Sequence, residues 1–159
     1  MDLKRDLNSV MSDMSNTFDT FNAAFKDNAD PILLDYTISE MHCIDTIARV
    51  ENPNVTKISK ALKMTRGGTS KLVRKHMARG AISAYRNSAN KKEIYYKLTD
   101  SGMAVFKAHE KIHRKWQKKN EEFFKDFSDA EIDAAINFIH KYTEFLNKAV
   151  SGFKWKSAR

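Results

Sequence analysis

The chain has 159 residues, of which 42% are hydrophobic, and a formal net charge of +8, which suits one small domain with helical extensions. No window reaches about 18 uninterrupted apolar residues, and the N-terminus lacks the apolar core of a secretory signal, so we expect neither a membrane span nor a membrane partner. The single cysteine, Cys43, excludes an internal disulfide and a cysteine-rich zinc module and predicts a reducing, cytoplasmic location.

The first predicted element is a long helix over residues 3–25. Its apolar residues recur every three or four positions and form one stripe, and Pro31 follows its end. A capping box opens the next helix, because the Thr37 hydroxyl can accept from the Glu40 amide while the Glu40 carboxylate accepts from the Thr37 amide. This helix is expected to run from Ile38 to about Val50.

Two short helices follow across a tight link at residues 63–64. The first is expected to be capped by Thr56, and the second by Thr65, with Gly80 ending it in a left-handed conformation. His76 lies on the apolar side of the second helix, where we interpret it as a packed core histidine. The opposite side is polar and cationic.

The hydrophobic period then changes from helical to alternating. Strands are predicted at residues 81–86 and 93–98, joined by a polar, cationic loop over residues 87–92. Two helices across a tight turn, followed by a hairpin, form a winged helix-turn-helix. We assign this DNA-binding domain to residues 37–99.

Two further helices complete the predicted order. The first opens at Thr99 and Asp100, and a second capping box, at Ser128 and Glu131, opens the last, which ends at Gly152. The fold is therefore predicted to be mainly α with a small β-hairpin. Because both chain ends carry more Phe, Ile and Leu than one small domain needs, we predict dimerisation helices at residues 1–36 and 100–150, before a basic tail at 151–159.

The positive charge is concentrated in residues 54–97. This segment holds twelve cations against one acid, Glu93, whereas the rest of the chain has more acids than cations. Like charges at this density repel one another unless a polyanion neutralises them. We therefore expect double-stranded DNA as the partner, in preference to the second candidate polyanion, an anionic membrane.

The second helix of the motif carries most of the predicted contacts. Side chains predicted to reach base edges are Thr65, Arg66, Thr69 and Ser70, with Arg66 the candidate for a bidentate contact to guanine. Gly67 and Gly68 are interpreted as permitting close approach to DNA, although tolerance by packing remains open. Predicted phosphate contacts come from Lys71, Arg74 and Lys75, and minor-groove contacts from Asn90, Lys91 and Lys92.

Four segments resemble the MarR family of bacterial transcription regulators over nearly the whole chain. They are TISEMH at residues 37–42, VTKISKAL at 55–62, TRGGTSK at 65–71 and KLTDSG at 97–102. The resemblance implies an obligate homodimer, two winged domains on a pseudo-palindromic operator, and a repressor as the expected type of regulator. The chain departs from the family at the wing, where the usual Asp and Arg are replaced by Asn90, Lys91 and Lys92.

Residues 109–113 match the H-E-x-x-H pattern, which places His109 and His113 on one helical face. The residues alone leave three interpretations open: two exposed histidines, a metallohydrolase using Glu110 as base, or a regulatory metal site. The chain is similar to the zinc-responsive branch of the family, which implies His42, His109 and His113 as zinc ligands. That branch's cysteine corresponds to Asp30, the implied fourth ligand, with Asp27 and Asp35 as alternatives.

The expected function is that of a dimeric, sequence-specific regulator whose operator binding responds to an effector. That effector is either zinc or an amphipathic small molecule held between the dimer helices and the winged domain. The protein is not expected to be an enzyme. The alternatives are a small zinc metallohydrolase and a sequence-neutral DNA-coating protein.

Overall fold

The computed structural model describes the backbone of residues 3–27, 30–87 and 90–152, and the side chains of residues 5–21, 30–87 and 92–149. Contacts divide the chain into Met1–Ile112 and His113–Arg159, with the division inside one continuous helix. Within the described residues, no helix is both long and apolar enough to cross a bilayer.

The predicted fold class and order of elements are confirmed, with one short 3₁₀ helix added. The elements are α1 (Leu3–Asp27), η1 (Pro31–Leu33), α2 (Ile38–Arg49), α3 (Val55–Ala61), α4 (Arg66–Ala78), β1 (Ile82–Asn87), β2 (Asn90–Leu98), α5 (Asp100–Phe124) and α6 (Asp129–Gly152).

Side-chain caps begin several of these helices. The Thr37–Glu40 capping box of α2 and the Thr65 cap of α4 are confirmed, as is the left-handed Gly80 after α4, with φ of 69°. The prediction for α3 was wrong. Its cap is Asn54, whose Oδ1 accepts from the Lys57 amide at 2.8 Å, and Thr56 lies inside the helix.

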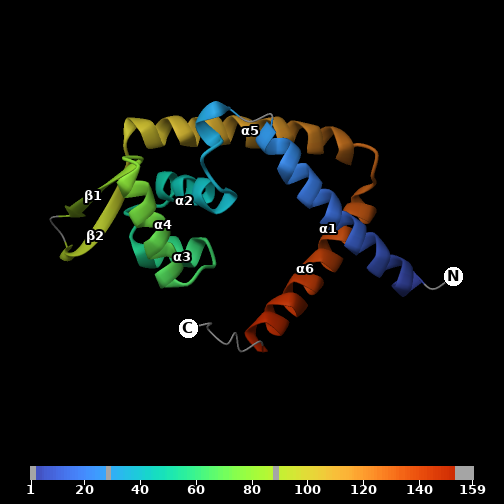
Figure 1. Ribbon diagram of the computed structural model, residues 1–159. Helices are drawn as coiled ribbons and strands as arrows, with labels where there is room; N and C mark the ends of the chain where they lie inside the picture. The colour runs from blue at the N-terminus through green and yellow to red at the C-terminus, as the bar shows by residue number, and fades with distance from the viewer. Residues whose placement is uncertain (1–2, 28–29, 88–89, 153–159) are drawn as a thin grey trace. The chain divides into compact units, whose positions relative to one another are not determined.

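A single core joins α2, α3, α4 and the hairpin. Figure 1 shows these three helices gathered beside the two strands. The buried side chains at their centre are Cys43, Ile47, Ile58, Val73, Ile82 and Tyr96. A second cluster packs α2 against the start of α5 through Leu33, Met41, Ile44, Ala81 and Val105. The helix-turn-helix thus packs against the hairpin and α2, and α2 in turn packs against α5.

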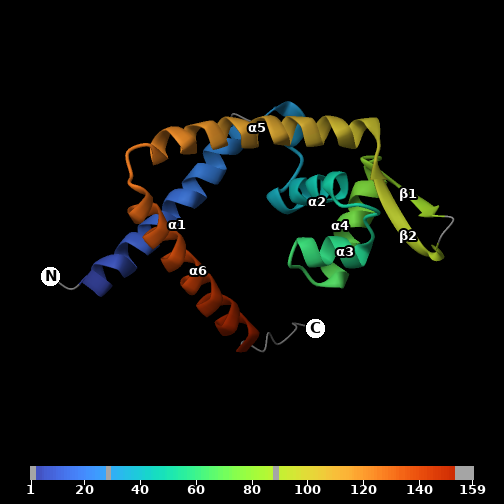
Figure 2. The same ribbon diagram turned by 180° about the vertical axis from the view of Figure 1, so that it is seen from behind.

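The hairpin is longer than predicted. The antiparallel register pairs Ile82 with Leu98 and Tyr85 with Tyr95, and it continues to Asn87 and Asn90. Most of the expected loop over residues 87–92 is therefore strand. In Figures 1 and 2 strands β1 and β2 extend away from α3 and α4.

Candidate nucleic-acid interface

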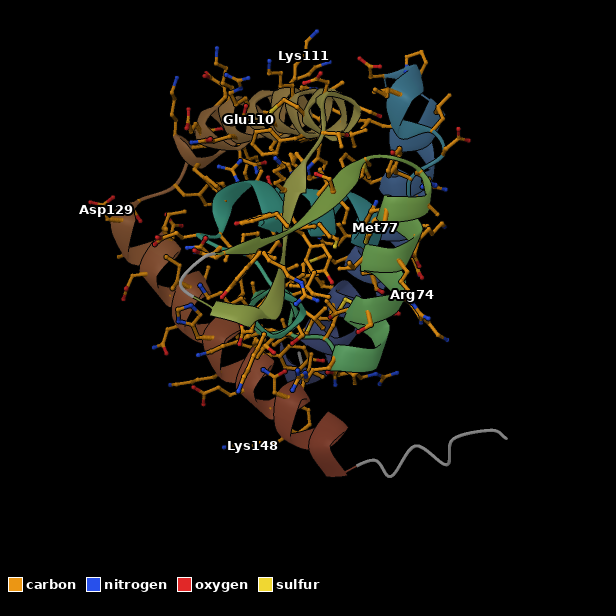
Figure 3. The ribbon with its side chains drawn as sticks, turned by 90° about the vertical axis from the view of Figure 1, so that its left-hand side faces the viewer. Arg74, Met77, Glu110, Lys111, Asp129 and Lys148 are labelled. Carbon is orange, nitrogen blue, oxygen red and sulfur yellow. The ribbon has the colours of Figure 1, made fainter. Side chains whose placement is uncertain are left out.

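The N-terminal end of α4 presents an exposed polar and cationic face. Thr65 caps the helix by accepting from the Gly68 amide at 3.2 Å, and Arg66 follows it at the surface. Lys71 and Arg74 continue this exposed face one and two turns on, and Figure 3 shows the Arg74 side chain projecting outward from α4. The positive end of the helix dipole, with cations beside it, suits a phosphate backbone.

Packing within the described residues does not require the glycine at 67. A Cβ built on Gly67 meets no atom within 4 Å, whereas one on Gly68 would lie 3.2 Å from the Thr65 hydroxyl. Gly67 therefore costs helix stability without a steric reason inside the chain. The absence of a side chain at Gly67 is therefore consistent with close approach of DNA, whereas at Gly68 contact with Thr65 explains the glycine.

The structure corrects the prediction for Thr69. Its side chain is fully buried, and its hydroxyl donates to the Thr65 carbonyl at 3.1 Å, so it faces the core and does not reach the surface of α4. Ser70, beside it, is partly exposed.

Lys75 is turned toward a buried carboxylate. Its ammonium pairs with Glu40, a residue of α2 that is only 1% exposed. Arg79 reaches the same carboxylate at 3.5 Å, and the Thr37 amide donates to it at 2.8 Å. Lys75 therefore ties α4 to α2, which leaves Lys71 and Arg74 as the better candidates for phosphate contacts.

Electrostatics around Glu40 favour its ionised form. Burial alone would raise the pKa of Glu40, but the hydrogen bonds from Lys75 and Thr37 and the charge of Arg79 lower it to about 2. Tyr36 links the cluster, because the Arg79 guanidinium lies 4.8 Å from the centre of its ring and His76 stacks on it at 6.0 Å. His76 is fully buried, as predicted for a core histidine, and burial lowers its pKa.

The hairpin carries the second group of residues that are predicted to contact DNA. Lys92 is exposed, and the side chains of Asn90 and Lys91 lie outside the described residues. Glu93 accepts a 2.6 Å hydrogen bond from Asn54, the cap of α3. The sequence analysis predicts neither this contact nor the cluster around Glu40. The signal available for the Glu93–Asn54 contact was that Glu93 is the one acid in a cationic segment.

The structure brings the three predicted histidine ligands together. A candidate ligand atom from each of His42, His109 and His113 lies within 4.8 Å of the other two, and the rings of His42 and His109 are 5.5 Å apart. His113 is one turn beyond His109 on the continuous helix α5, which sets their spacing. Three imidazole nitrogens at this separation fit zinc, which prefers nitrogen and sulfur ligands.

The predicted fourth ligand is not part of this cluster. The Asp30 carboxylate caps η1 by accepting from the Ile32 amide at 3.1 Å. Beside the cluster, Glu110 forms an ion pair with Arg49 of α2 at 3.6 Å, and Arg49 also bonds Asp45 at 3.0 Å. The carboxylate of the H-E-x-x-H pattern is thus engaged with a cation.

No family model matches the chain. The HTH-type transcriptional regulator PchR of Bacillus subtilis (strain 168) is 31% identical over 109 residues, which are 69% of this chain and 64% of PchR. The chain thus spans less than two thirds of the length of that relative.

Solved structures share the fold. FabT of Streptococcus pneumoniae, in complex with DNA, superposes with a TM-score of 0.70 at 21% identity, covering 93% of this chain and 99% of FabT. A zinc-responsive MarR family member, ZitR of Lactococcus lactis, gives a TM-score of 0.59 at 23% identity, covering 84% of this chain and 99% of ZitR.

Proposed function

We propose that the chain, which has the fold of winged helix-turn-helix proteins, is a dimeric, sequence-specific DNA-binding transcription regulator of the MarR type, with repression as its mode. The observation that carries this proposal is the exposed cationic face of α4 beside the hairpin, within a segment of twelve cations and one acid. Arg66 is assigned to base edges, and Lys71 and Arg74 to phosphates.

The dimer is proposed from apolar surface on the terminal helices. On α1, Val10 is 62% exposed and Phe18 57%, and on α6, Phe145 is 61% exposed. No residue of α6 whose burial is described is buried. A second copy of the chain would cover these exposed apolar side chains, and their removal from water would stabilise the dimer.

A binding experiment tests the regulator. A duplex enriched by the protein from a random library should bind more tightly than its scrambled counterpart, and affinity should fall steeply with salt, with a slope of about −0.9 per phosphate contacted. Arg66→Ala should reduce the preference by roughly 5- to 150-fold, the worth of one bidentate base contact.

Lys71→Ala is the matched control, because losing a phosphate contact weakens both duplexes alike. Light scattering on the same sample should give the mass of two chains. Equal affinity for all duplexes would leave a DNA-coating protein instead, and an absence of duplex binding in dilute buffer would overturn the proposal.

For the effector, we propose zinc held by His42, His109 and His113. The clustering of three imidazoles on α2 and α5 supports this. Bound zinc would supply a fixed charge joining the two helices, with no chemical step. A hydrolase is disfavoured because Glu110 is paired with Arg49, so we propose that the protein is not an enzyme.

Calorimetry with zinc chloride tests the site. His113→Ala should weaken zinc binding by more than the roughly 10- to 100-fold that loss of an outer-sphere partner costs. His140→Ala, on α6 and outside the cluster, should bind zinc as the wild type does. Equal, weak binding by all three proteins would remove zinc as the effector and leave the amphipathic small molecule.

A further inference from the structure

We propose that Glu93 is a positioning residue, which fixes the hairpin against the helix-turn-helix and so determines how sharply the protein discriminates between DNA sequences. This inference rests on the proposed function. It concerns the one acid in the cationic segment, on strand β2, and its contact with Asn54.

The Asn54 side chain uses both ends of its amide. Its Oδ1 accepts from the Lys57 amide at 2.8 Å and caps α3, while its Nδ2 donates to the Glu93 carboxylate at 2.6 Å. The Glu93 carboxylate therefore joins strand β2 to the N-terminal cap of α3, the helix that precedes α4.

Two further contacts attach the hairpin to the loop between α2 and α3. The Tyr96 amide donates to the Pro53 carbonyl at 2.9 Å, and the Tyr85 hydroxyl donates to Asn52 at 3.2 Å. On β2, Glu93 precedes Tyr96 and also Tyr95, the partner of Tyr85, so its contact with Asn54 is the nearest of these contacts to the hairpin tip. An isolated two-stranded hairpin is only marginally stable, so the contact of Glu93 with Asn54 adds to what holds the outer part of the hairpin in place.

Because Glu93 is charged, an electrostatic role and a positioning role predict different changes in DNA binding when it is replaced. A carboxylate on a surface that meets phosphates opposes binding to any duplex. A purely electrostatic role therefore predicts tighter binding and unchanged discrimination when Glu93 is removed. A positioning role predicts that discrimination falls even though binding to unrelated duplexes improves.

The experiment compares Glu93→Ala with Glu93→Gln, because both remove the same charge and only glutamine can still accept from Asn54. Both variants should bind a scrambled duplex more tightly than the wild type. Only Glu93→Ala should lose preference for the enriched duplex, by about tenfold, the worth of one hydrogen bond to a charged group. Asp19→Asn, at an exposed acid of the same unit, controls for the loss of one negative charge.

A second pair of variants changes the charge in the opposite direction. Asn54→Asp keeps an acceptor for the cap of α3 but sets a carboxylate against Glu93, so discrimination should fall. Adding Glu93→Gln to it restores the wild-type charge and reverses the donor and acceptor, so discrimination should return.

Amide exchange separates positioning from unfolding: with Glu93→Ala it should speed up in β2 and stay unchanged in α3. Equal discrimination by Glu93→Ala, Glu93→Gln and the wild type would overturn the inference. Failure of the wild type to bind any duplex would instead overturn the proposed function.

Discussion

Replacing Glu40 with alanine should lower the free energy of unfolding by about 2–4 kcal/mol, measured by urea titration. The change removes half of the α2 capping box and the acceptor for Lys75 and Arg79. The cost should lie near or below the lower end of the roughly 3–5 kcal/mol that breaking a fully buried pair costs, because both cations are partly exposed and regain water.

Glu131→Ala is the matched control, since Glu131 completes the same kind of capping box at the start of α6 but is exposed. Its loss should be much smaller. Glu40→Gln should fall between Glu40→Ala and the wild type, because an amide oxygen can still accept from Thr37 while the ion pairs are lost. Similar losses for the two alanine variants would show that the burial and cations around Glu40 contribute nothing.

The same cluster predicts the pH dependence of stability. The folded pKa of Glu40, about 2, lies below its ordinary value of 4.5, so its contribution is complete above pH 4.5 and is lost as pH falls from 4.5 to 2. Burial also lowers the pKa of His76 below 6.5. Because the unfolded chain then takes up the proton first, stability falls below pH 6.5 as well.

Melting temperature measured against pH should therefore fall from about pH 6.5 downward. His76→Phe, which retains a ring against Tyr36, should flatten the upper part of the curve and leave the loss below pH 4.5. A wild-type curve that is level between pH 7 and 5 would contradict the role of His76.

Local signals predicted the helix starts well, because a capping box acts within one turn. Thr37, Glu40 and Thr65 are such cases. The cap of α3 shows the limit. Asn54 and Thr56 are both good caps by residue type, and the Asn54 amide is further held by Glu93, which lies 39 residues away along the chain.

The positions of the site residues could be predicted only where the face of a single helix determined which side chains are exposed. Periodicity placed Arg66, Lys71 and Arg74 at the surface correctly. It failed for Thr69, because a small polar side chain at the edge of a face can satisfy its hydroxyl within its own helix and pack inward. Periodicity also assigns Lys75 to phosphate, because its position on the helix face is the only signal in the sequence. Its actual partner, Glu40, is brought near by the packing of α4 on α2.

The second large effect is expected at Gly102, near the start of α5. By helix propensity alone, Gly102→Ala would stabilise the chain by about 1 kcal/mol. Here the added Cβ would overlap the Ala81 carbonyl oxygen, which also accepts from the Thr99 amide at 3.1 Å. Backbone cannot rotate away as a side chain can, so we expect a net loss of about 3 kcal/mol in urea titration.

Gly67→Ala provides the control with the opposite sign. It lies in α4 with open space where its Cβ would stand, so alanine should raise the free energy of unfolding by about 0.5–1 kcal/mol. If Gly67 serves close approach to DNA, the same variant should bind the enriched duplex less tightly although it is more stable. If the Gly102→Ala protein proved as stable as the Gly67→Ala protein, α5 would be able to shift away from Ala81. The close packing of α5 against Ala81 would then not restrict residue 102 to glycine.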